Sequence, residues 1–223
     1  MIKDLPKDLQ NALKEYFYNP YPGYVYIYNS ILVLKDIENH NLIKIMRSND
    51  AIDGKPQIWS SIFATIFCFT GLEPKNKKIL DVGSRIGHFA IPLAETGMHV
   101  TCVEALLLPC RVIRAIQLLR NQENIMVINS TIQEYLPTSD TEFDLAMMLN
   151  VFDHILRQGE EEAWKVLDEL SKRARKMALM MGPTDQVSVD GIPGAVMRHS
   201  RYKYYTKLLS NSYGGRDLWG FTR

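Results

Sequence analysis

Short apolar runs alternate with longer amphipathic segments along most of this chain from residue 77 onward. The apolar runs, which fit β-strands, lie at 77–83, 98–105, 124–131, 143–155 and 176–182. The segments with helical spacing lie between them, at 86–97, 107–122 and 160–176. Because strands with near-continuous apolar sequence are buried on both faces, this alternation predicts an α/β fold with a doubly wound, mostly parallel sheet. The loops that follow the strands then gather along one edge of that sheet.

The first 54 residues do not follow this alternation. They read as a helix at 6–18, a strand or hairpin at 24–36 that turns at Asn29-Ser30, and a linker at 49–57. We therefore interpret residues 1–54 as an N-terminal extension, a candidate lid or substrate element, and residues 55–223 as the main domain.

The main domain is expected to open with a helix at 58–70. Its tail, after the last strand of the alternation, is expected to contain a turn-rich segment at 182–194, a helix at 200–210 and a closing strand at 216–222.

Charge and cysteine usage limit the compartment and the partners. A net charge of +1 gives no global field that would attract a polyanion. The three cysteines show neither disulfide nor metal-ligand spacing, which indicates reduced thiols and no metal site. The N-terminus lacks the apolar core of a signal peptide, and the longest apolar run, 58–72, is too short to cross a membrane. We expect a cytoplasmic protein without a membrane partner.

The stretch ILDVGSRIGHF, residues 79–89, ends a predicted strand in two glycines, Gly83 and Gly87. Their spacing differs from the GxGxxG pattern that delivers a diphosphate to a helix N-terminus. Asp81 would repel a diphosphate, but it suits a ligand with a cationic ammonium or sulfonium group. Glu104 ends the next strand, where an acid can accept both hydroxyls of a ribose. A ribose, a positive charge and no phosphate together describe S-adenosylmethionine (SAM).

On these residues the chain resembles the class I SAM-dependent methyltransferases, over roughly residues 55–182. Asp81-x-Gly83-x-x-x-Gly87 is similar to the first motif of that family, and Glu104 matches its ribose-binding acid. The segment 143–155 is similar to the fourth motif, and the stretch 81–105 also looks like the FkbM-type O-methyltransferases.

The resemblance implies a seven-stranded Rossmann-like sheet with an antiparallel last strand, SAM as the cofactor and S-adenosylhomocysteine (SAH) as the product. The residues that it places around the cofactor are Asp81, Gly83, Ser84, Arg85, Gly87, Glu104, Ala105, Thr131, Ile132 and Leu149. Thr131 stands where the family usually has an acidic residue near the adenine amine. Arg85 is either a solvated loop side chain or a partner of the cofactor carboxylate.

Asn150, Asp153 and His154 follow the fourth-motif strand, at the edge where an acceptor would arrive. His154 is a candidate general base, because a histidine titrates near neutral pH and can take a proton from an attacking hydroxyl or amine. The alternative is a loop histidine paired with Asp153. Asn150 either orients the acceptor or satisfies backbone groups at the strand end.

The absence of other acceptor motifs favours O-methyl transfer to a small-molecule or glycan hydroxyl. The chain has no Asn/Asp-Pro-Pro-aromatic motif, no cysteine in the fourth motif, and no acid set for a catechol-type magnesium site. RNA is the alternative acceptor, because basic and aromatic residues interleave over 198–207; that stretch is either a solvated helix face or a surface for an anionic ligand. A catalytically inactive binding subunit and a nicotinamide-dependent oxidoreductase are further alternatives, although the latter would need GxGxxG.

Overall fold

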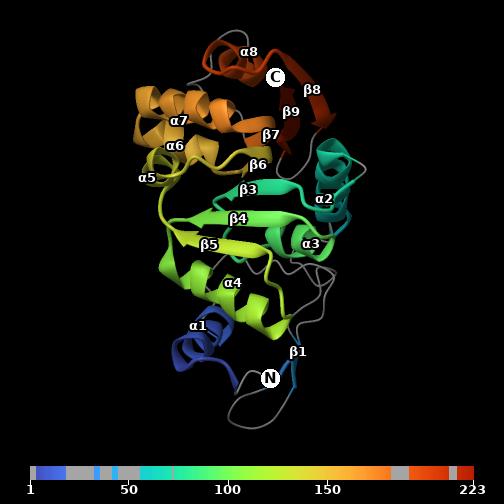
Figure 1. The fold of residues 1–223 in the computed structure, drawn as a ribbon, viewed down its shortest axis with the longest axis vertical. Helices are drawn as coiled ribbons and strands as arrows, with labels where there is room; N and C mark the ends of the chain where they lie inside the picture. Colours follow the sequence, from blue (N-terminus) through green and yellow to red (C-terminus); the bar gives the residue numbers. More distant parts are fainter. Residues whose placement is uncertain are drawn as a thin grey trace.

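The computed structural model describes residues 4–18, 33–35, 42–44, 56–71, 73–181, 191–210 and 215–223. Within this part of the chain a seven-stranded sheet has the order β5-β4-β3-β6-β7-β9-β8 (Figure 1). Its strands are β3 (Lys78–Val82), β4 (His99–Glu104), β5 (Ile125–Asn129), β6 (Phe143–Leu149), β7 (Ala174–Met181), β8 (Tyr204–Leu209) and β9 (Asp217–Thr222).

The strand directions follow the prediction. All neighbours from β5 to β7 pair in parallel, whereas β9 is antiparallel to both β7 and β8. The predicted seven-stranded, mostly parallel sheet with an antiparallel last strand is therefore confirmed. The order reverses between β3 and β6, and a doubly wound sheet binds its ligand at the carboxyl ends of strands at such a point.

Helices cover both faces of the sheet because its central strands alternate between two apolar cores. In β6, Leu145 and Met147 join one core cluster, whereas Ala146 and Met148 join the other. The first cluster is covered by α2 (Pro56–Thr70), α3 (Ala90–Glu95) and α4 (Leu107–Leu119). The second is covered by α5 (Ile132–Tyr135), the 3-10 turn η3 (Leu136–Thr138), α6 (Phe152–Gln158), α7 (Glu160–Arg173) and α8 (Gly191–Arg198).

The N-terminal helix α1 (Lys7–Tyr18) lies beside α4, at the end of the molecule opposite α8 (Figure 1). Leu9 and Leu13, one turn apart, are buried and belong to the same core cluster as Ile116 of α4. Two three-residue strands, β1 (Val33–Lys35) and β2 (Leu42–Lys44), pair antiparallel. No helix in the described ranges is long and apolar enough to cross a membrane.

Parts of the predicted N-terminal extension lie outside the described residues. These are the turn at Asn29-Ser30, most of the strand expected at 24–36, and residues 49–55 of the expected linker. The last two linker residues, Pro56 and Gln57, begin α2, so the helix expected at 58–70 starts two residues earlier. The division at residue 54 stays a prediction.

The helix expected at 200–210 is wrong, because residues 204–209 form the edge strand β8. In a strand paired with β9, successive side chains point to opposite faces of the sheet. The ring of Tyr205 lies 6.0 Å from that of Trp219 and 6.4 Å from that of Phe221, while both Tyr204 and Tyr205 remain exposed. These cross-strand aromatic contacts depend on β9 and cannot be read from residues 200–210 alone.

The turn-rich segment expected at 182–194 is also wrong in its last residues, because residues 191–198 form α8. Pro193 lies in the first turn of this helix, where its missing N–H leaves no helical hydrogen bond unmade. The closing strand expected at 216–222 is confirmed as β9.

Candidate active site

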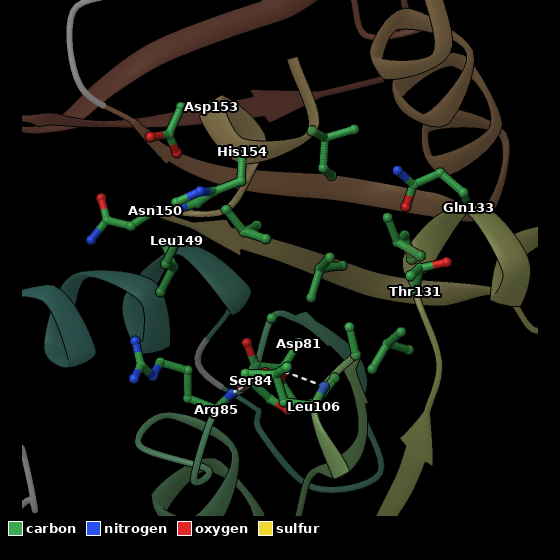
Figure 2. A pocket seen from close by; sticks show the side chains of 18 of the residues that line it. Asp81, Ser84, Arg85, Leu106, Thr131, Gln133, Leu149, Asn150, Asp153 and His154 are labelled. Atoms are coloured by element: carbon green, nitrogen blue, oxygen red, sulfur yellow. Dashed lines mark hydrogen bonds between the residues drawn. The ribbon is translucent and has the colours of Figure 1, made fainter. Parts of the chain in front are cut away.

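A cavity of about 790 Å³ opens at the carboxyl ends of β3, β4 and β6, beside the point where the strand order reverses. This volume is typical of pockets that enclose a small molecule. All the site residues predicted above line it except Gly87. Figure 2 shows Asp81, Ser84 and Arg85 on one side, Asn150, Asp153 and His154 on another, and Thr131 and Gln133 on a third.

Gly83 lets the loop after β3 approach the loop after β6. Its φ of 68° lies in the left-handed region, and a Cβ built on it would lie 2.9 Å from Cγ2 of Val151. The Gly83 N–H donates to the carbonyl of Val103, at 2.8 Å, which ties the turn to β4. Gly87 does not line the cavity: its Cβ would meet Ile91, so it serves the packing beneath the loop.

Glu104 is buried at the end of β4, with 6% of its surface exposed. Its Oε2 accepts from the backbone N–H of Arg85 at 2.8 Å, and its Oε1 accepts from that of Leu106 at 2.9 Å. These two bonds fix the carboxylate between the first loop and the start of α4. Each carboxylate oxygen has a second lone pair, so both can still accept from a ligand hydroxyl.

Asp81 lies at the end of β3 and is 4% exposed. Burial, and after it the nearby charge of Glu104, raise the pKa of Asp81 from 3.8 to about 7. Two carboxylates that share one cavity form a site that favours a cation, because a positive ligand removes the repulsion between them.

The pKa of Asp81 makes the stability of the ligand-free protein depend on pH in a defined direction. A carboxyl whose pKa is higher in the folded than in the unfolded state binds its proton more tightly when folded. Its contribution to the free energy of unfolding is therefore fully present below about pH 4 and is lost as the pH rises to about 7. Asp81→Asn should remove this slope. Urea unfolding of both proteins between about pH 4 and pH 7 measures it, and parallel profiles would contradict the assignment.

The loop after β6 and the first turn of α6 leave two buried oxygens without a hydrogen-bond partner in the described part of the chain. They are Oδ1 of Asn150 and Oδ1 of Asp153. Asn150 has a φ of 60°, a conformation that costs energy outside glycine, and its N–H donates to Met180 at 2.7 Å. Buried acceptors are seldom left unpaired, so a ligand that donates hydrogen bonds fits this side of the cavity.

His154 lies in the first turn of α6 and is exposed, not in a loop as expected. The expected alternative, a pair between His154 and Asp153, is not the contact that forms. Oδ2 of Asp153 accepts from Arg157 at 2.7 Å, one helical turn away. Figure 2 shows His154 directed toward Asn150, so its imidazole borders the cavity.

Thr131 lines the cavity, but its hydroxyl is engaged in a hydrogen bond within its own helix. Its Oγ1 accepts from the N–H of Glu134 at 3.3 Å, and the carboxylate of Glu134 accepts from the N–H of Thr131 at 3.1 Å. This capping box starts α5. Sequence reasoning missed Gln133 and Leu106, which also line the cavity. Leu106 is 64% exposed, and its position two residues after Glu104 was a usable signal.

Comparison with known proteins agrees with this geometry. Residues 80–180 match the protein family described as methyltransferase domain. These residues are a methyltransferase domain. They run from Leu80 in β3 to Met180 in β7, and so contain Asp81 of β3 and the loop after β6 that carries Asn150. No curated protein matches the chain in sequence.

Solved structures share the fold of the methyltransferase domain. Monomeric WbdD has a TM-score of 0.62 at 18% identity, over 92% of this chain and 47% of its own. Magnesium protoporphyrin IX methyltransferase (ChlM) from Synechocystis PCC 6803, with bound SAM, has a TM-score of 0.58 at 18% identity, over 75% and 79%. The N-terminal domain of EvdMO1, with SAH bound, has 0.58 at 13% identity, over 73% and 81%. The chain spans about half the length of the WbdD chains that it matches.

The family match over residues 80–180 bears out the predicted methyltransferase superfamily for that part of the chain, and the fold agrees with it. ChlM and the EvdMO1 domain hold SAM and SAH, the cofactor and the product named in the prediction. The similarity to the FkbM-type subgroup does not appear in these comparisons.

Proposed function

We propose that this chain transfers the methyl group of SAM to a hydroxyl oxygen of a small-molecule or glycan-like acceptor. One observation carries the proposal: the buried carboxylates of Asp81 and Glu104 share a cavity whose other side holds unpaired hydrogen-bond acceptors. The first feature suits a cationic adenosine derivative, and the second suits an acceptor that donates hydrogen bonds.

The cofactor half of the cavity has a group for each part of SAM. Glu104 would accept the ribose hydroxyls, and Asp81 would face the positive charge. The exposed side chain of Leu106 offers an apolar face to the adenine ring, next to Ile132. Since the hydroxyl of Thr131 is used by its helix, the carboxamide of Gln133 is the better partner for the adenine edge.

The acceptor half would align the nucleophile and remove its proton. When bound, SAM supplies an electrophilic methyl carbon on its sulfonium. A second donor group of the acceptor, such as a neighbouring hydroxyl, would donate a hydrogen bond to the unpaired Oδ1 of Asn150 and orient the acceptor, which leaves the proton of the reacting hydroxyl available. His154 would take the proton through its imidazole, which borders the same side of the cavity.

RNA is the second predicted class of acceptor. Several side chains of the basic stretch 198–207 make contacts within the protein. The ring of His199 stacks on Trp164 at 4.4 Å, and the hydroxyl of Tyr202 donates to a backbone carbonyl at 3.2 Å. Lys207 pairs with Asp217 at 2.7 Å. No described residue of 198–207 lines the cavity. The name of ChlM likewise refers to a small-molecule acceptor. These observations support the small-molecule proposal.

Three finer assignments belong to the same proposal. The FkbM-type subgroup is supported by the stretch 81–105. A cytoplasmic location is supported by the three cysteines, which form no disulfide. The extension of residues 1–54 is supported by the sequence, which follows the strand-helix alternation only after it; its helix α1 packs on α4 and shares the core cluster of the main domain.

Product analysis tests the proposal. The purified chain is incubated with SAM that carries a deuterated methyl group, in parallel with a small-molecule extract and with total RNA. We expect SAH to form with the extract, and deuterium to appear in a methyl ether. Label found only in RNA would overturn the small-molecule acceptor, and label found only on nitrogen would overturn the hydroxyl assignment. An Asp81→Ala protein serves as the control for SAM breakdown.

A further inference from the structure

Asp81 and Glu104 lie on the same face of the sheet, on neighbouring strands. In the register of β3 and β4, Asp81 pairs with Cys102, and Glu104 follows Cys102 by two residues. Side chains two residues apart on a strand point to the same face, so the two acids are diagonal neighbours. Both are buried, and both line the cavity. The cofactor half of the cavity therefore places two carboxyl groups close together, away from bulk water.

The two carboxyl groups differ in their hydrogen bonds. Glu104 accepts from two backbone N–H groups, those of Arg85 at 2.8 Å and Leu106 at 2.9 Å. No described residue donates a hydrogen bond to the side chain of Asp81. Hydrogen bonds from N–H groups favour the ionised form of an acid, whereas burial without them favours the neutral form. Of the two, Asp81 is therefore the acid that keeps a proton.

The strands and the helix next to Asp81 contribute no other group that titrates near neutral pH. The partner of Asp81 on β6 is Met147, and its partner on β4 is Cys102. Burial, and after it the charge of Asp81, raise the pKa of the Cys102 thiol. Burial, and after it the charge of Glu104, raise the pKa of the Cys110 thiol on α4. Both thiols stay protonated near neutral pH.

The loop after β3 adds Arg85 and His88. Burial, and after it the charge of Arg85, lower the pKa of His88 from 6.5 to about 4, so this imidazole is neutral above pH 6. Figure 2 shows Asp153 and His154 on a different side of the cavity from Asp81. The charged and titratable side chains that line the cavity beyond its cofactor half are Asp153, His154, Arg157 and Arg216.

Resting on the cofactor half of the function proposed above, we propose that Asp81 carries a proton before SAM binds and releases that proton to the solvent as SAM binds. A proton and a cationic ligand each remove the repulsion between the two acids, so they compete for the same carboxylate. Proton release then accompanies cofactor binding, and the affinity for SAM rises with pH.

The coupling has a defined sign and size. With a pKa of about 7, Asp81 is ionised in about one tenth of the ligand-free molecules at pH 6 and in about nine tenths at pH 8. The apparent affinity is proportional to the fraction in the form that binds. The Kd for SAM should therefore fall by about 10-fold between pH 6 and pH 8.

Calorimetric titration of SAM in two buffers that differ in their heat of ionisation counts the protons released on binding. In phosphate and imidazole at pH 6.5, we expect roughly three quarters of a proton for each SAM bound. In phosphate and Tris at pH 8, we expect about one tenth of a proton. Titrations at pH 6 and pH 8 give the change in Kd.

Two variants identify the source of the proton. Asp81→Asn resembles the protonated acid, so it should release no proton. Its Kd for SAM should be the same at pH 6 and pH 8, and at least as weak as that of the unaltered protein at pH 6. His154→Gln removes the other cavity group of a type that titrates near neutral pH, and its proton release should equal that of the unaltered protein.

The outcomes separate this inference from the proposed function. If SAM binds with equal heat in both buffers and with one Kd at pH 6 and pH 8, the proton coupling is overturned and the proposed function stands. Proton release that persists in Asp81→Asn, or disappears in His154→Gln, would assign the proton to another group and also overturn the inference. If SAM binds at neither pH, the proposed cofactor site fails, and the inference fails with it.

Discussion

Alanine in place of His154 should lower kcat about 10²–10⁴-fold and leave the affinity for SAH unchanged. His154 is exposed on the first turn of α6, and its imidazole borders the acceptor half of the cavity. Loss of a general base removes proton transfer from the transition state and leaves the cofactor contacts intact. Steady-state kinetics with the acceptor found by product analysis, together with calorimetry of SAH, measure both quantities.

His99→Ala is the matched control for this variant. His99 is exposed at the start of β4, at the opposite edge of the sheet, and does not line the cavity. We expect its kcat to equal that of the unaltered protein. A His154→Ala protein with the same kcat would show that His154 is a surface residue, and the proton would then leave by another route.

Alanine in place of Glu104 should weaken SAH binding by about 1–3 kcal/mol, which is roughly 5–150-fold. The change removes the charged acceptor of the ribose hydroxyls. It also frees the backbone N–H groups of Arg85 and Leu106, which now bind its two oxygens. Glu104→Gln keeps one acceptor oxygen and should give a smaller loss. Calorimetric titration of SAH into each protein measures the difference.

Glu123→Ala is the control for charge alone, because Glu123 is exposed and lies outside the cavity. Its SAH affinity should be unchanged. If Glu104→Ala also binds SAH with unchanged affinity, then Glu104 does not hold the ribose, whatever its position in the cavity.

The strands could be predicted wherever the local sequence alone shows an apolar run. Runs such as Ile79-Leu80 and Leu145 to Leu149 are apolar at every position because each strand is covered on both faces. The edge strand β8 lacked this signal. Its residues are mostly exposed, and its strand state depends on contacts with Trp219 and Phe221 that the local sequence does not contain.

The candidate site divides in the same way. Asp81, Gly83 and Glu104 were predictable because they end or follow strands within one short segment, where local order fixes their position. Arg216 was not, because it reaches the cavity only after β9 inserts antiparallel beside β7. Gln133 was not predicted, because the position of Thr131 suggested that Thr131 itself contacts the adenine. The structure shows that the hydroxyl of Thr131 is engaged in a capping box.

A crystal structure of the protein with SAH tests the central claim most directly, namely that one cavity binds the cofactor between the carboxylates of Asp81 and Glu104. The account predicts both ribose hydroxyls within hydrogen-bond distance of Glu104, the amino group or sulfur on the side of Asp81, and the sulfur facing Asn150 and His154. SAH bound with its ribose away from Glu104, or at another place on the chain, would contradict it.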